Sequence, residues 1–105
     1  IISVSYDQTL KLWNLTTGQV KQTLTGHESW VNAVAVVDPQ RIVSASDDGT
    51  LKVWDLTIGQ VIASIGLDGA PQCVAVARQD GRTLVVAGDA GGSLYCLELV
   101  EPVAS

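Results

Sequence analysis

Short runs in which apolar and polar residues alternate fill the chain, and turns rich in glycine, proline and aspartate separate them. Alternation with a period of two is typical of β-strands. The pattern predicts ten strands and no helix. The predicted strands are residues 1–5, 9–14, 20–25, 31–37, 41–46, 50–55, 60–65, 72–77, 83–87 and 93–99.

Local signals indicate how these strands are joined and which of them is most deeply buried. Asp48-Gly49 is typical of a tight β-hairpin. Gly18 supplies the positive φ that a turn requires. Residues 31–37 are apolar on both faces, which predicts a strand buried in the middle of the fold.

A repeat organises the chain. The segments LKLWNLTTGQV (10–20) and LKVWDLTIGQV (51–61) lie 41 residues apart. A weaker third copy includes LYCLEL (94–99), which lies 43 residues after the matching LKVWDL (51–56). A period of about 40–45 residues, with a Gly-His pair and a Trp-Asp pair in the unit, is typical of propeller blades.

One complete unit, residues 26–65, contains Gly26-His27, Asp48-Gly49 and Trp54-Asp55 in register, and it resembles the WD-repeat family. The resemblance covers nearly all of the chain. It implies an all-β fold, a partial WD-repeat β-propeller of about two and a half four-stranded antiparallel blades. The divisions implied are 1–25 for the end of one blade, 26–65 for a complete blade, 66–100 for a degenerate last blade, and 101–105 for a C-terminal tail.

Two and a half blades do not close a ring, and proteins avoid unpaired sheet edges. We therefore expect the remaining blades of the propeller, or further copies of the chain, to complete it. The degenerate last unit looks like the C-terminal blades of bacterial WD-repeat signalling proteins. That resemblance implies a sensor within a larger multidomain regulatory protein.

Composition and charge narrow the classes of partner. The chain has 105 residues, 47% of them apolar, and a net charge of −5. The acidity argues against nucleic acid and against anionic lipid as partners. No stretch is long and apolar enough to span a bilayer, and the first residues do not resemble a signal peptide. Cys73 and Cys96 are interpreted as small core residues in a reduced, cytoplasmic compartment, the alternative being a disulfide.

Four polar or aromatic residues of the complete unit have two interpretations. His27, Ser44 and Asp48 are the residue types of a catalytic triad. The resemblance instead implies a structural hydrogen-bond network that runs in series through these residues and Trp54. We favour the network, because nothing in the sequence suggests an oxyanion hole or an exposed nucleophile. Ser44 and Ser46 are expected on the same face, and Ser44 is the preferred member.

The other two units match the network incompletely. The first unit retains equivalents of the serine, the aspartate and the tryptophan, which are Ser3, Asp7 and Trp13. The last unit replaces the histidine, the aspartate and the tryptophan with Leu67, Gly91 and Leu97. We therefore expect packing alone to hold the last blade and expect this blade to be the most labile.

The sequence predicts no cofactor and no metal site. Asp47-Asp48-Gly49 lacks the ligand spacing of a calcium loop. One histidine and two distant cysteines do not make a zinc site. Residues 88–92 are rich in glycine but lack the lysine and the following helix of a phosphate-binding loop.

Candidate binding residues follow from the resemblance, position by position. In WD-repeat proteins the face that carries the Gly-His loops and the hairpins between second and third strands is the usual docking surface. The residues that this implies are Trp30, Asn32 and Asp47 in the complete unit, Tyr6 in the first and Gln72 in the last. Trp30 resembles a binding anchor, but it can also cap the blade end or pack on a neighbouring blade.

The predicted function is a non-catalytic protein–protein interaction scaffold or sensor, whose partner is another protein. A small-molecule or glycan-binding propeller is the first alternative. It requires polar and aromatic clusters repeated between blades, and one exposed tryptophan is thin support. A hydrolase that uses His27, Ser44 and Asp48 is the second alternative.

Overall fold

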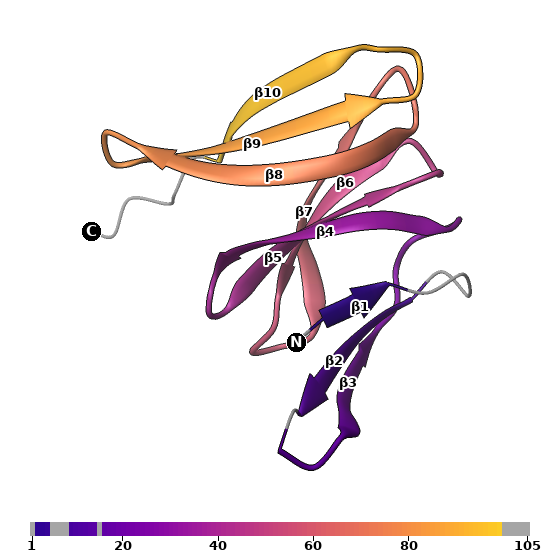
Figure 1. Ribbon diagram of the computed structural model, residues 1–105, viewed down its shortest axis with the longest axis vertical. Coiled ribbons are helices and arrows are strands. Elements are labelled where there is room, and N and C mark those ends of the chain that lie inside the picture. The colour runs from indigo at the N-terminus through magenta and orange to yellow at the C-terminus, as the bar shows by residue number, and fades with distance from the viewer. Residues whose placement is uncertain (1, 5–8, 15, 100–105) are drawn as a thin grey trace.

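The computed structural model describes residues 2–4, 9–14 and 16–99, and every regular element in these ranges is a β-strand (Figure 1). The strands are β1 (Ile2–Val4), β2 (Leu10–Asn14), β3 (Gln19–Leu24), β4 (Val31–Asp38), β5 (Arg41–Ser46), β6 (Thr50–Asp55), β7 (Gln60–Gly66), β8 (Pro71–Gln79), β9 (Arg82–Asp89) and β10 (Leu94–Leu99). The predicted all-β class is confirmed. No helix in the described ranges is long and apolar enough to cross a membrane.

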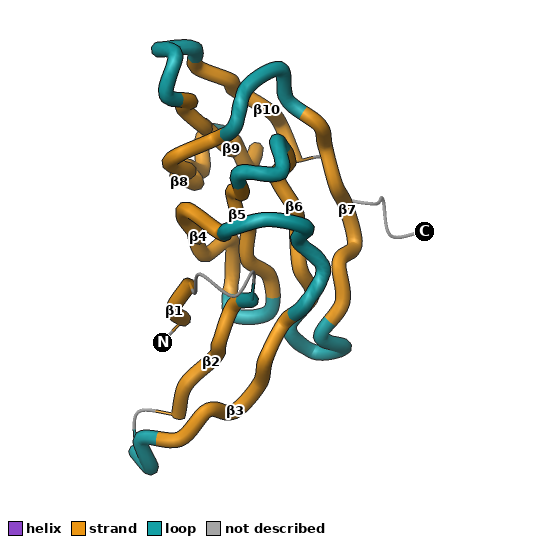
Figure 2. The backbone as a smooth tube through the Cα atoms, turned by 90° about the vertical axis from the view of Figure 1, so that its right-hand side faces the viewer, coloured by secondary structure: helices purple, strands orange, loops and turns teal. Residues whose placement is uncertain are grey.

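The strands form three antiparallel sheets, which we name the first, middle and last blade. The first blade has the order β1-β2-β3, the middle blade β4-β5-β6-β7, and the last blade β10-β9-β8. Figures 1 and 2 show the three sheets stacked one on the next in chain order. The arrangement is a partial propeller that does not close, as predicted.

Glycines occupy the turn positions at which the backbone has a positive φ. In the β5–β6 hairpin, Gly49 has a φ of 84° and its N–H donates to the Ser46 carbonyl at 3.1 Å. The turn between β6 and β7 has Gly59 at a φ of 70°, and its N–H donates to the Asp55 carbonyl at 2.8 Å. Both glycines adopt a backbone conformation that side chains disfavour.

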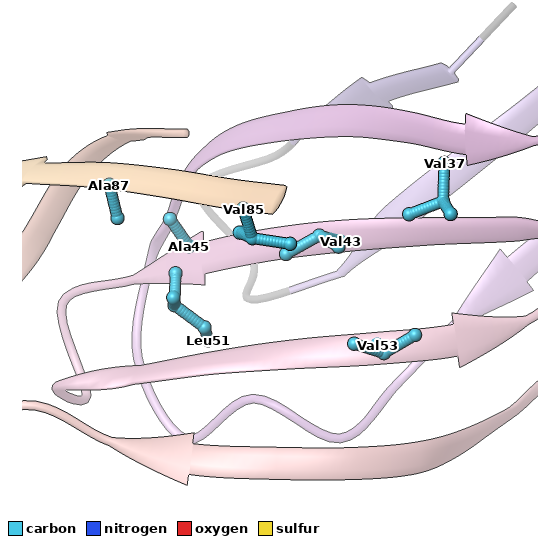
Figure 3. Packing of buried hydrophobic residues seen from close by; sticks show 7 residues of the cluster. All are labelled: Val37, Val43, Ala45, Leu51, Val53, Val85 and Ala87. Atoms are coloured by element: carbon cyan, nitrogen blue, oxygen red, sulfur yellow. The ribbon is translucent and has the colours of Figure 1, made fainter. Parts of the chain in front are cut away.

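Alternate residues of the middle blade enter two separate cores, because successive side chains of a strand point to opposite faces. Ile42 and Trp54 pack with Leu10, Leu24 and Val31 on the side of the first blade. The core between the middle and last blades is shown in Figure 3, and its buried members are Val37, Val43, Ala45, Leu51, Val53, Val85 and Ala87.

Strand β4 is less buried than its sequence predicts. Val31 and Val37 are buried, but Val36 is 61% exposed. Val36 lies opposite Ile42, on the side of the first blade, and the first blade has only three described strands. The face of β4 that points to the first blade is therefore only partly covered.

Both cysteines are exposed, so the prediction that they are core residues is wrong. Each is a free thiol, and β9 separates their strands. Cys73 lies in β8 and Cys96 in β10, on the face of the last blade that points away from the middle blade. Leu94 on that face is 78% exposed, whereas Leu51, its counterpart in the middle blade, is 3% exposed. The described residues place no sheet against this outer face.

Hydrogen bonds as well as packing hold the last blade, contrary to expectation. The Tyr95 hydroxyl donates to Asp89 Oδ2 at 3.0 Å, and Asp89 Oδ1 accepts the N–H groups of Gly91 and Ser93. These bonds, with the backbone N–H of Ser93 foremost, lower the pKa of Asp89. Asp89 lies at the β9–β10 hairpin. Near the β8–β9 hairpin, at the other end of the strands, Arg78 Nη2 donates to the Val37 carbonyl at 2.7 Å and joins the last blade to the middle one.

Candidate functional site

A chain of hydrogen bonds links three side chains inside the middle blade. Trp54 Nε1 donates to Ser44 Oγ at 2.7 Å, and Ser44 Oγ lies 2.5 Å from His27 Nε2. An indole N–H only donates, so the serine oxygen accepts this bond. The other ring nitrogen of His27, Nδ1, faces the Asp48 carboxylate, which only accepts. A neutral His27 therefore carries its proton on Nδ1 and accepts the Ser44 hydroxyl at Nε2.

His27 completes the series through its second nitrogen, which lies 3.0 Å from Asp48 Oδ2. The imidazole is buried, and its centroid lies 5.9 Å from that of the Trp54 ring. Burial lowers the pKa of His27, and the neighbouring Asp48 carboxylate opposes this only in part. The imidazole is consequently neutral at pH 7, with Nδ1–H directed at the carboxylate.

Asp48 is the most highly connected group of the network. Its Oδ2 also accepts the Glu28 N–H at 3.0 Å, and its Oδ1 accepts the Thr50 N–H at 2.9 Å and the Thr50 hydroxyl. Burial alone raises the pKa of Asp48, but the bonds from Thr50, Glu28 and His27 outweigh it and lower the pKa to about 2. The carboxylate stays charged over the whole physiological range.

Thr50 is a member that the sequence pattern did not single out. It follows Asp48 by two residues, across the hairpin glycine. Short acidic side chains commonly accept the N–H two residues on, and this local signal was available. The hydroxyl contact, in contrast, depends on the side-chain conformation within the folded hairpin.

The two candidate serines have different roles. Ser44 joins Trp54 to His27, as preferred from the sequence. Ser46 Oγ instead donates to the Trp30 carbonyl at 2.8 Å and accepts the Asp48 N–H at 3.1 Å. Ser46 thus fastens the loop before β4 to the β5–β6 hairpin.

The geometry of Ser44 argues against the hydrolase alternative. A nucleophilic serine needs an accessible oxygen. Ser44 is 0% exposed, and its oxygen accepts the Trp54 N–H. The three residue types of a triad are present, but here they form a buried structural cluster.

A second polar cluster lies at the surface, where the middle and last blades meet. Asp47 Oδ1 accepts Asn32 Nδ2 at 2.7 Å and Gln72 Nε2 at 3.3 Å. Asn32 Nδ2 also donates to the Pro71 carbonyl at 2.9 Å. The Asp47 N–H donates to the Trp30 carbonyl at 2.9 Å, so this cluster is adjacent to the tryptophan.

Trp30 is 51% exposed. The structure therefore brings together Trp30, Asn32, Asp47 and Gln72. Tyr6 and Asp7 lie outside the described residues, as do the side chains of Ser3 and Trp13. Within the described ranges, no group of three or more His, Cys, Asp or Glu side chains is placed to hold a metal ion.

Four loops share one end of the strands, on the right in Figure 1, and we name this surface the loop face. It comprises residues 26–30, 46–50, 66–70 and 89–93. None of these twenty positions is lysine or arginine, and the charged residues are Glu28, Asp47, Asp48, Asp68 and Asp89. Arg41, Arg78 and Arg82 lie at the opposite end, in the β4–β5 and β8–β9 hairpins.

Comparison with known proteins gives consistent results. The family profile "WD40: WD domain, G-beta repeat" matches residues 18–55. Small ribosomal subunit protein RACK1y of Oryza sativa subsp. japonica is 50% identical over 36 residues, which are 34% of this chain and 11% of that protein.

Two solved structures share the fold over nearly the whole chain. The β-propeller domain of Myceliophteria thermophila Cps50 (Swd1) has a TM-score of 0.84 at 19% identity, over 97% of this chain and 33% of that one. The computationally designed Ika4 protein has a TM-score of 0.74 at 31% identity, over 94% of this chain and 59% of that one. This chain thus spans between 11% and 59% of the length of these proteins.

The family profile covers most of the complete unit, including its Gly-His pair, its β5–β6 hairpin and its Trp-Asp pair. The two solved structures match all three blades. The chain thus contains a WD40 repeat at residues 18–55, and its three blades have the fold of a β-propeller.

Proposed function

We propose that this chain is a non-catalytic scaffold that binds another protein through its loop face. WD-repeat propellers generally bind other proteins. The observation that carries the proposal is the half-exposed ring of Trp30 beside the hydrogen-bonded surface cluster of Asn32, Asp47 and Gln72. Tyr6 matches Asp47 in the first unit, and we propose it as a further binding residue.

The backbone around Trp30 is fixed before any partner arrives. Its carbonyl accepts both the Ser46 hydroxyl and the Asp47 N–H. A rigid, partly exposed aromatic side chain loses little conformational entropy on binding and is enriched among residues that dominate interface energy. Trp30 is therefore the proposed anchor, and the polar cluster supplies hydrogen-bonding groups around it.

The test is site-specific photo-cross-linking. A photoreactive amino acid replaces Trp30 in one variant and Ile58, which is exposed at the opposite end, in the control. We expect a discrete protein adduct from position 30 only. The purified partner should then bind the Trp30→Ala variant at least about tenfold more weakly, a loss of about 1.4 kcal/mol, and the Ile58→Ala variant unchanged. Equal losses in the two variants would disprove docking on the loop face.

We also propose that further blades accompany these three, either from a longer regulatory polypeptide or from further copies of this chain. The support is the bare outer face of the last blade, where Leu94 is 78% exposed. In the middle blade the matching face is covered. Light scattering on the isolated chain tests the second source: a discrete oligomer supports it, and a monomer excludes it.

The free thiols of Cys73 and Cys96 support our proposal that the protein works in a reducing, cytoplasmic setting. Exposed thiols at the surface of a blade are prone to intermolecular disulfide formation in oxidising compartments. Thiol labelling immediately after lysis tests the proposal. Unmodified cysteines are expected, and oxidised ones would contradict it.

A further inference from the structure

The surface cluster of Asn32, Asp47 and Gln72 has already used its hydrogen-bond donors. Asn32 Nδ2 donates to Asp47 Oδ1 at 2.7 Å and to the Pro71 carbonyl at 2.9 Å. Gln72 Nε2 donates to Asp47 Oδ1 and to the Ala70 carbonyl, both at 3.3 Å. A side-chain amide has two N–H hydrogens, so neither amide has a donor left for a ligand.

The orientation of the two amides follows from the chemistry of their partners. A carboxylate and a backbone carbonyl only accept hydrogen bonds, so the amide nitrogens must face them. The oxygens Asn32 Oδ1 and Gln72 Oε1 make no hydrogen bond within the described residues. Asp47 Oδ2 also has no partner in this part of the chain. The cluster therefore presents three open acceptors and no open donor.

The charge of the surrounding loop face has the sign that suits these acceptors. None of its twenty positions is lysine or arginine. Asp48 and Asp89 are held by hydrogen bonds inside the middle and last blades. Glu28 and Asp68 are exposed, and within the described residues their carboxylates make no hydrogen bond or ion pair. Negative charge that this face does not compensate thus surrounds the open acceptors.

Trp30 adds an aromatic ring to this surface. The ring belongs to a residue that is 51% exposed and whose carbonyl accepts the Asp47 N–H. A cation placed over an indole ring is attracted by the electrostatic field of its π face. The guanidinium group of arginine is planar, stacks on aromatic rings and carries five N–H donors, whereas a lysine ammonium is a compact point charge. Several open acceptors adjacent to an exposed indole therefore fit a guanidinium better than an ammonium.

We propose that the loop face binds a cationic segment of the partner protein, in which one arginine stacks on Trp30 and donates to the three open acceptors. The inference rests on the function proposed above, because it assigns the chemistry of the partner at the same surface. Glu28 and Asp68 offer sites for further cationic residues, which favours a peptide segment over a single amino acid.

The probe is a fluorescent peptide in which arginines alternate with Gly-Ser pairs, and fluorescence anisotropy measures its binding to the intact chain. Two matched peptides carry lysine or citrulline, the neutral analogue, at every arginine position. We expect saturable binding of the arginine peptide. The affinity should be at least about threefold lower for the lysine peptide and at least about tenfold lower for the citrulline peptide. Added salt should weaken binding, because it screens exposed charges.

Asp47→Asn and Asp80→Asn are a matched pair of chain variants, since each removes one carboxylate. Asp80 is exposed in the β8–β9 hairpin, at the opposite end of the strands. Asparagine at position 47 retains an oxygen for the two amides and replaces the open acceptor with an NH₂ donor. This variant should weaken binding of the arginine peptide at least about fivefold, and Asp80→Asn should leave it unchanged.

Three results would overturn the proposal, with both variants shown to be folded by circular dichroism. Equal weakening by Asp47→Asn and Asp80→Asn would mean that the peptide responds only to net charge. Equal affinity for the arginine and citrulline peptides would exclude recognition of a cation. Equal affinity for the arginine and lysine peptides would exclude recognition of the guanidinium.

The experiments separate a failure of this inference from a failure of the proposed function. A partner adduct from position 30 without binding of the arginine peptide would refute the cationic segment and leave the docking surface in place. Binding of the arginine peptide that depends on Asp47, without any adduct from position 30, would support the arginine site and count against the function proposed for the whole face.

Discussion

Trp54 and His27 meet on a single atom, since the indole N–H and imidazole Nε2 both lie within hydrogen-bonding distance of Ser44 Oγ. The tryptophan sits on β6, the serine on β5 and the histidine in the loop before β4. One hydroxyl thus joins three segments of the middle blade. The Asp48 carboxylate, at the other nitrogen of the ring, fixes the imidazole tautomer.

Replacing Trp54 with phenylalanine removes the indole N–H and retains an aromatic ring in the core. The Ser44 oxygen then loses a buried donor, and we expect the free energy of unfolding to fall by about 1–3 kcal/mol. Urea denaturation followed by circular dichroism measures it. Trp30→Phe, at the exposed tryptophan, should change stability by less than about 0.5 kcal/mol. An unchanged denaturation midpoint for Trp54→Phe would mean that the Trp54–Ser44 hydrogen bond does not contribute to stability.

His27 makes stability depend on pH near neutrality. Burial holds its folded-state pKa below the ordinary 6.5, so the unfolded chain binds a proton more readily. The stabilisation is fully present above pH 6.5 and is lost as the pH falls below that value toward the folded-state pKa. The chain has one histidine. The denaturation midpoint of the native chain should therefore be lower at pH 5 than at pH 7. The same difference should be much smaller in the His27→Gln variant.

Asp48 produces a second pH dependence at lower pH. Its pKa falls from 3.8 to about 2 on folding, so its contribution is present above pH 3.8 and is lost between about pH 4 and pH 2. Asp48→Asn should lower the free energy of unfolding by about 1–3 kcal/mol at pH 7. The difference from the native chain should shrink as the pH approaches 2. Asp47→Asn, one residue earlier and exposed, serves as the control and should show neither effect.

Tyr95→Phe tests the polar anchor of the last blade. The variant loses the hydroxyl that donates to Asp89 but retains the ring against the core. Hydrogen exchange should become faster at the β9–β10 hairpin and remain unchanged in the middle blade. Uniformly faster exchange would mean that the three blades unfold together, and no change would mean that packing alone holds this hairpin.

The strands could be predicted to within about two residues because period-two alternation and turn glycines are local properties. The bounds of β5 and β6 agree with the predicted ranges 41–46 and 50–55. The exposure of Cys73 and Cys96 could not be predicted in the same way. It depends on whether another sheet covers the outer face of the last blade, which alternation within a strand does not reveal.

The network of the middle blade and the Tyr95–Asp89 bond of the last blade differ in the same respect. His27, Ser44 and Trp54 were found together because a complete repeat unit contains them in register. The bond between Tyr95 and Asp89 has no counterpart in that unit, where Lys52 and Ser46 occupy the matching positions. A degenerate repeat can therefore have hydrogen bonds of its own in place of the usual network. Alignment of its sequence with the complete unit shows only that the network residues are missing.

The middle and last blades are fastened to each other at both ends of their strands. Asn32 donates to the Pro71 carbonyl at the loop face, and Arg78 donates to the Val37 carbonyl at the other end. A single bond would allow one sheet to rotate about it relative to the other. Bonds at both ends oppose this rotation and also oppose sliding of the sheets. A force applied at Trp30, which directly precedes β4, is therefore transmitted to β8 with little relative movement of the two strands.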